Sequence, residues 1–167
     1  MVVTVLVVFA ILLYIYIYTR PKRDVQLIQT QIDSFNPDLL LEKQPVLIYS
    51  EIVDKKEFID ISFRYQYMFS KEIWVANGDI IQNNSKFALI HNDTEEDREI
   101  LIRKRRIKTK LGEVYHTHLG GDDEFSDYIK VILKPYNVLV LPYLFEYKST
   151  KDIKITYLTD VLHAVSP

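Results

Sequence analysis

The stretch YIKVILKPYNVLVLPYLFEYKS, residues 128–149, indicates the fold of this chain most directly. It contains three short apolar runs, which are separated by groups that include Pro135, Asn137 and Pro142. β-Branched and aromatic residues dominate the runs, and the first and last of them alternate between apolar and polar side chains. Short runs of this kind, divided by turn residues, predict consecutive β-strands.

The same pattern recurs along most of the chain beyond residue 44. Many short strands at nearly even spacing predict a mainly β domain, an antiparallel β-sandwich or barrel. Asn77-Gly78 is the favoured pair for a tight hairpin turn within the segment 72–82. Trp74 and the aromatic residues of 63–69 are expected in the core, although an exposed recognition surface is the alternative. The other predicted strands cover residues 45–50, 63–69, 86–92, 98–110, 113–119 and 153–158.

Two segments predict helices instead. Residues 24–44 place apolar side chains at helical spacing, which predicts a juxtamembrane helix followed by a turn at Asn36-Pro37. Residues 54–61 predict a short helix with Asp54 as its N-cap.

The first 23 residues, MVVTVLVVFAILLYIYIYTRPKR, carry no charged side chain before Arg20. A bilayer core of about 30 Å needs about 20 apolar helical residues, which this stretch nearly supplies. No basic residue precedes the stretch and no A-x-A site follows it, so a retained transmembrane anchor is predicted in preference to a signal peptide. A buried strand or core helix is the alternative. The side chains expected to contact lipid include Val2, Leu6, Phe9, Leu12, Tyr14, Tyr16 and Tyr18.

The charges that flank the apolar stretch predict its orientation in the membrane. Arg20, Lys22 and Arg23 follow the apolar stretch, and the positive-inside rule then places the rest of the chain on the cytoplasmic side. The expected parts are an anchor at 1–20, a juxtamembrane segment at 21–44 and a β-sandwich domain at 45–167.

Composition restricts the function classes. The chain has 167 residues, a net charge of −2 and no cysteine. Disulfides, thiolate nucleophiles and cysteine-based zinc sites are therefore excluded, and no general attraction to nucleic acid is expected. Asn83 and Asn92 match the glycosylation pattern, but so short a pattern recurs by chance.

The segment GEVYHTHLGGDDEF, residues 112–125, is the strongest local candidate for chemistry. On a strand, His116 and His118 would project from one face, and Asp122 or Asp123 could add a carboxylate across the Gly-Gly turn. Two histidines and a carboxylate are the ligands of non-haem iron enzymes. Exposed histidines beside an acidic turn need no metal, however, and we expect no cofactor.

Several segments together resemble the cupin family, including its JmjC-like hydroxylase branch. The resemblance implies a jelly roll in which Pro142 matches the proline of the second cupin motif, while Tyr147 stands where that motif has its metal-binding histidine. It therefore implies a cupin-like fold with a degenerate metal site and no catalysis. The alternative is a membrane-tethered non-haem iron and 2-oxoglutarate oxygenase. The segments that carry the resemblance are NPDLLLEKQPVLIYS (36–50), GEVYHTH (112–118), ILKPYNVLVLPYLFEY (132–147) and IKITYLTDVL (153–162).

A basic run follows the acidic segment DTEEDRE. Its lysines and arginines predict nuclear import, contact with phosphate or lipid headgroups, or a surface that docks an acidic partner, and a solvated edge strand or hairpin is the alternative. No aromatic platform accompanies the run, so nucleic acid is not an expected partner. The residues are Arg103, Lys104, Arg105, Arg106, Lys108 and Lys110.

A single apolar N-terminal span before a small cysteine-free β domain is similar to the membrane-anchored small cupin-like proteins of nucleocytoplasmic large DNA viruses. The resemblance implies a minor capsid protein that links an internal virion membrane to capsid or other shell proteins. A membrane adaptor for an acidic partner is a further possibility.

Overall fold

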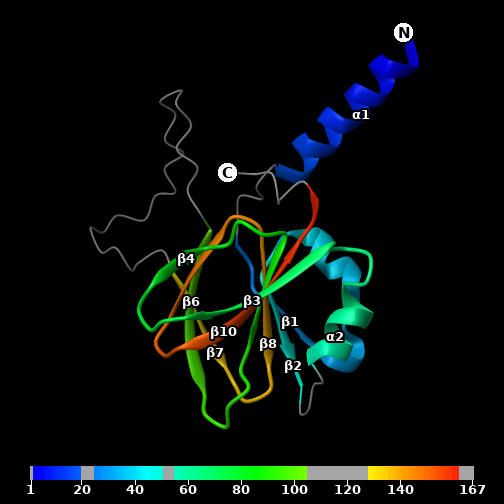
Figure 1. Cartoon of the computed structure of the whole chain (residues 1–167). Helices are drawn as coiled ribbons and strands as arrows, with labels where there is room; N and C mark the ends of the chain where they lie inside the picture. Colours follow the sequence, from blue (N-terminus) through cyan, green and yellow to red (C-terminus); the bar gives the residue numbers. More distant parts are fainter. Residues whose placement is uncertain (1, 20–24, 51–54, 105–127, 162–167) are drawn as a thin grey trace.

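The computed structural model describes residues 2–19, 25–50, 55–104 and 128–161. A long helix, α1, extends away from a compact β domain (Figure 1). The prediction of a mainly β, largely antiparallel domain is confirmed. The helical elements are α1 (Val2–Thr19), η1 (Ile32–Ser34), η2 (Pro37–Glu42) and α2 (Lys55–Ser62). The strands are β1 (Ile28–Gln31), β2 (Val46–Tyr49), β3 (Phe69–Val75), β4 (Ile80–Gln82), β5 (Phe87–His91), β6 (Arg98–Lys104), β7 (Ile129–Leu133), β8 (Val138–Pro142), β9 (Phe145–Ser149) and β10 (Ile153–Thr159).

The described strands form two sheets that pack face to face. One sheet has six strands in the order β1-β2-β8-β5-β10-β3, and the other has four in the order β4-β9-β6-β7. Side chains from both sheets, including Leu139 and Ile155 of the first and Ile100 and Phe145 of the second, form one buried cluster. This shared core defines a β-sandwich.

The outer face of the six-stranded sheet is covered by α2 and the two 3₁₀ helices. Phe58 and Phe63 pack with Phe35 and Phe87, with neighbouring ring centroids 5.5 to 6.4 Å apart. The strands beneath are buried on both faces, which explains why their sequences are continuous apolar runs.

Strand directions give the sandwich two distinct ends. The starts of β1, β2, β3 and β5 lie together with the end of β10. At this end Ile28 N donates to Pro45 O at 2.9 Å, Met68 N donates to Thr159 O at 2.9 Å, and Thr159 Oγ1 bonds Ser85 Oγ at 3.0 Å. We call it the attachment end, because the chain enters the domain here from α1.

The first residues of the domain differ from expectation. Residues 24–44 were expected to include a helix, but Ile28–Gln31 forms β1, which pairs in parallel with β2. Alternation of half-buried and exposed side chains along IQTQ suits an edge strand better than a helix. The predicted break at Asn36-Pro37 is confirmed, because η2 begins there with the Asn36 side chain accepting a hydrogen bond from Asp38 N at 2.9 Å.

Two strand predictions are also corrected. The predicted strand at 63–69 begins only at Phe69, because α2 (the predicted short helix) continues into a turn in which Phe63 N bonds Ile59 O. The predicted hairpin at Asn77-Gly78 is wrong, although Gly78 has the expected positive φ of 88°. β3 pairs with β10 and β4 pairs with β9, so this turn carries the chain from one sheet to the other.

Candidate functional site

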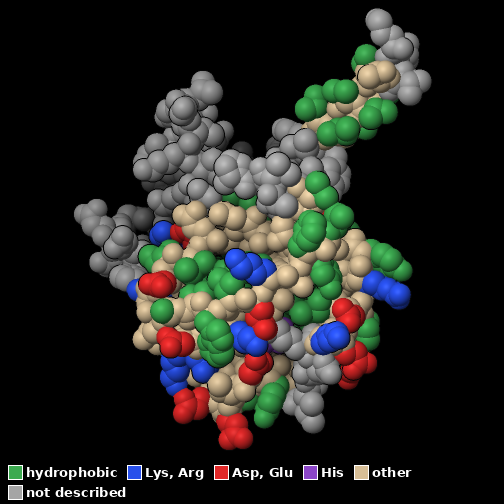
Figure 2. Space-filling model, in the orientation of Figure 1, with side chains coloured by type: hydrophobic (Ala, Val, Ile, Leu, Met, Phe, Trp, Pro, Cys, Tyr) green, Lys and Arg blue, Asp and Glu red, His purple; other side chains and the backbone are tan. Residues whose placement is uncertain are grey.

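The first candidate surface is α1, whose side chains are described for residues 4–13. Its large apolar side chains are 44 to 62% exposed, and they include the predicted lipid-facing residues Leu6, Phe9 and Leu12. Successive helical residues are about 100° apart, so eight apolar residues between Val5 and Leu13 cover every face. Figure 2 shows hydrophobic atoms along the part of α1 that stands clear of the domain. Among the residues whose side chains the structure describes, which in α1 are residues 4–13, no helix is long and apolar enough to cross a membrane.

The other predicted lipid-facing side chains, those of Val2, Tyr14, Tyr16 and Tyr18, lie outside the described part of α1. Their assignment stays a prediction.

The second candidate surface consists of exposed aromatic side chains in β3 and in the turn before it. Tyr65 is 89% exposed and Trp74 is 72% exposed, so the expectation that these aromatic residues belong to the core is wrong. β3 is the edge of its sheet among the described strands, and Trp74 points outward while Ile73 and Val75 contact the core cluster. Phe63 is buried, as expected. Sequence alternation alone cannot identify an edge strand, and this is why the exposed side chains were missed.

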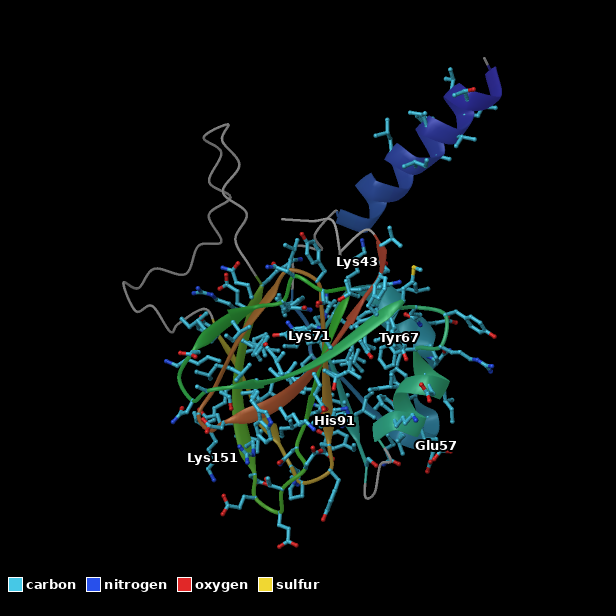
Figure 3. The ribbon with its side chains drawn as sticks, viewed as in Figure 1. Lys43, Glu57, Tyr67, Lys71, His91 and Lys151 are labelled. Atoms are coloured by element: carbon cyan, nitrogen blue, oxygen red, sulfur yellow. The ribbon has the colours of Figure 1, made fainter. Side chains whose placement is uncertain are left out.

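A shallow groove of about 720 Å³ lies beside the aromatic surface, where α2 ends. Pro37, residues 60–62 and residues 64–67 line it. Figure 3 shows Tyr67 on the side of the domain that carries α2. Burial and the nearby Asp60 carboxylate raise the pKa of Tyr67, so its hydroxyl is a neutral donor. The groove is therefore lined by a mixture of polar and apolar groups, which includes two phenols, one carboxylate and the guanidinium of Arg64.

The basic run begins at the attachment end, at the end of β6, and only Arg103 and Lys104 of the predicted docking residues are described. Arg103 Nε donates to Glu146 Oε2 at 2.6 Å, and its guanidinium carbon lies 4.5 Å from the centre of the Tyr128 ring. Gln82 Nε2 donates to the other Glu146 oxygen at 3.3 Å. The Glu146 side chain is only 8% exposed, so Arg103 balances a buried carboxylate within the domain. Arg105, Arg106, Lys108 and Lys110 lie outside the described residues.

The structure describes only part of the metal site that the cupin resemblance predicts. His116, His118 and Asp122 lie outside the described residues. Tyr147, at the position of the cupin histidine, is fully buried, and its hydroxyl bonds that of Tyr157 across the two sheets. Burial raises the pKa of both hydroxyls, which therefore stay neutral and are poor metal ligands. Within the described ranges, no group of three His, Cys, Asp or Glu side chains could hold a metal ion.

Both asparagines of the glycosylation pattern are structural. Asn83 and Asn92 are each 1% exposed. Asn83 Nδ2 donates to the carbonyls of Leu141 and Pro142 at 2.9 and 3.0 Å, and Asn92 Nδ2 donates to Leu133 O at 2.8 Å. Each side chain fixes the turn that follows β4 or β5, so the nitrogen that a glycan would modify is occupied in the folded domain.

Comparisons with known proteins identify no family. No family model matches the chain, and no curated protein matches it. A mutant of CooA from Carboxydothermus hydrogenoformans is similar over 68% of this chain and 61% of that chain, with 10% identity and a TM-score of 0.32. The alignment thus spans less than two thirds of CooA, and a likeness of this size supports no inference about fold or function.

Proposed function

We propose that this chain is a non-enzymatic, membrane-anchored structural protein. The observation that carries the proposal is α1, an 18-residue helix without a charged side chain, whose described apolar side chains are exposed on every face. A helix that is apolar all round is stable either inside a protein core or in lipid. The described side chains of α1 do not belong to either core cluster of the domain, so lipid is the remaining apolar environment.

The free energy of insertion agrees with this choice. α1 contains twelve Val, Leu, Ile or Phe residues. At about 0.3 to 0.6 kcal/mol each, they favour insertion by roughly 4 to 7 kcal/mol. Its length of 18 residues corresponds to about 27 Å, close to the thickness of a bilayer core.

The β domain would then connect the membrane to proteins of a surrounding shell. We base this part of the proposal on the predicted resemblance to anchored cupin-like proteins of large DNA viruses, and it implies a position between an internal virion membrane and the capsid. The exposed β3 edge with Trp74 is the described surface that suits such contacts. An anchor confines the domain to a thin layer and raises its effective concentration near the shell proteins, so several weak contacts are enough to hold the two layers together.

The anchor is tested with the full chain in liposomes, by flotation followed by extraction at alkaline pH. The wild type should stay with the lipid, whereas the double variant Phe9→Arg, Leu12→Arg should be released. Two central arginines cost about 5 to 7 kcal/mol, which cancels the apolar gain. Trp74→Arg is the matched control, because it exchanges an exposed aromatic for arginine outside the helix. Extraction of the wild type, or retention of the double variant, would overturn the proposal.

The structural role is tested by co-purification. The full chain should remain with a membrane-containing particle and with its shell proteins after cross-linking. Recovery only with free cellular membranes would favour the adaptor alternative. Stoichiometric iron together with decarboxylation of 2-oxoglutarate would instead establish the oxygenase alternative.

A further inference from the structure

The chain between α1 and the β domain is short. α1 ends at Thr19, and Val25 already packs against the core between the two sheets. Six residue steps separate them, and a fully extended chain spans at most about 3.5 Å per residue, or roughly 21 Å. With α1 in a bilayer, as the proposed function requires, the attachment end is therefore held within about 20 Å of the lipid.

Exposed apolar side chains gather at this end. Phe69 starts β3 opposite Thr159, Met68 precedes it and bonds Thr159 O, and Val161 lies two residues beyond Thr159. Leu41 lies two residues before Lys43, which Figure 3 shows on the side of the domain nearest α1. All four apolar side chains are more than half exposed, at 53 to 72%. Covering these side chains with another apolar surface would be favourable.

Charge is distributed unequally between the two ends. Lys43, Lys86 and Lys104 lie at the attachment end together with Glu42 and Asp160, and Lys86 pairs with Asp160 at 3.5 Å. The loops at the opposite end are acidic, and Figure 2 shows acidic side chains at the pole far from α1. The described residues of these loops carry six carboxylates against two lysines, and Arg98 adds a third cation where β6 begins; the carboxylates are Asp79, Asp93, Glu95, Glu96, Asp97 and Asp152, and the lysines are Lys134 and Lys151. An anionic surface would thus attract the attachment end and repel the other.

We infer that the attachment end lies directly on the lipid surface. Leu41, Met68, Phe69 and Val161 enter the headgroup region, and the lysines lie beside anionic headgroups. The inference rests on the proposed anchor and adds a fixed orientation: the acidic pole faces away from the membrane. The bilayer is the surface that covers these four apolar side chains. The short connection between α1 and Val25 leaves little room for a protein layer between the attachment end and the lipid.

The absence of native cysteine allows a direct experiment. The variants Met68→Cys and Val161→Cys of the full chain are each labelled with an environment-sensitive fluorophore at the new cysteine. Each labelled protein is reconstituted into phosphatidylcholine vesicles with or without phosphatidylserine. Ile80→Cys is the matched control, because Ile80 is also an exposed apolar residue but starts β4 at the opposite end. Flotation of each labelled protein is measured separately.

Lipids spin-labelled at the headgroup should quench the labels at Met68 and Val161 at least about twofold more than the label at Ile80. Phosphatidylserine should increase this difference. If the proteins float but all three labels are equally quenched, the surface contact is wrong while the anchor stands. If they do not float, the proposed anchor is wrong and this inference falls with it.

Discussion

The buried pair Tyr147 and Tyr157 allows a quantitative test of the interior. Tyr147→Phe removes one hydroxyl from the bond that joins the two sheets and leaves the ring in place. At neutral pH the loss should be about 1 kcal/mol of the free energy of unfolding, the usual contribution of a single neutral hydrogen bond.

The same substitution should have the opposite effect in alkali. Burial raises the pKa of Tyr147 well above its ordinary value of 10.0. The folded state then keeps its proton while the unfolded chain loses it, so this contribution is fully present below about pH 10 and is lost as the pH rises. At about pH 11 the loss for one such group is about 1.4 kcal/mol. Phenylalanine cannot ionise, so the variant should equal or slightly exceed the wild type there.

The assay is urea unfolding of the full chain in mild detergent, followed by circular dichroism between about pH 8 and pH 11. The expected result is a crossing of the two stability curves near the upper limit. Parallel curves over the whole range would show that Tyr147 ionises as readily in the folded state as in the unfolded chain. That outcome would refute the assignment of Tyr147 as a neutral, buried hydroxyl.

Two further predictions concern other buried polar groups. Arg103→Ala should lower the free energy of unfolding by about 2 to 3 kcal/mol, since Glu146 would remain buried without its cation, whereas Lys130→Ala, which breaks an exposed ion pair, should cost less than about 1 kcal/mol. Equal losses in urea unfolding would contradict this difference. Asn83 and Asn92 should stay unmodified when the domain is expressed in a glycosylating host, because their side-chain nitrogens are bonded inside the fold. A glycan mass on either asparagine would show that the side chain is modified before the turn around it closes.

The strands that could be predicted are those in which burial leaves a strong pattern. Val138–Pro142 and Val46–Tyr49 are continuous apolar runs, because each lies between the inner core and the cover of α2 and the 3₁₀ helices. Their turn residues also marked the boundaries correctly. Such segments depend on local composition, which a sequence displays directly.

The errors arose where partners decide the structure. The segment IQTQ at 28–31 forms a strand because it pairs with the edge of β2. No local sequence signal indicates a parallel partner 18 residues away. Asn77-Gly78 makes a turn as expected, but the pairing of β3 with β10 follows from the packing of the whole sandwich. The exposure of Trp74 has the same cause. An edge strand and a central strand have similar sequences, and only the neighbours distinguish them.

The parallel pairing of β1 with β2 has a mechanical consequence. A pull on α1 reaches the domain through Val25 and acts along β1, from its first residue outward. The inter-strand hydrogen bonds run across that direction, so the four paired residues of β1 resist the load together rather than opening one after another. The pairing of β1 with β2 therefore resists tension along the axis of β1.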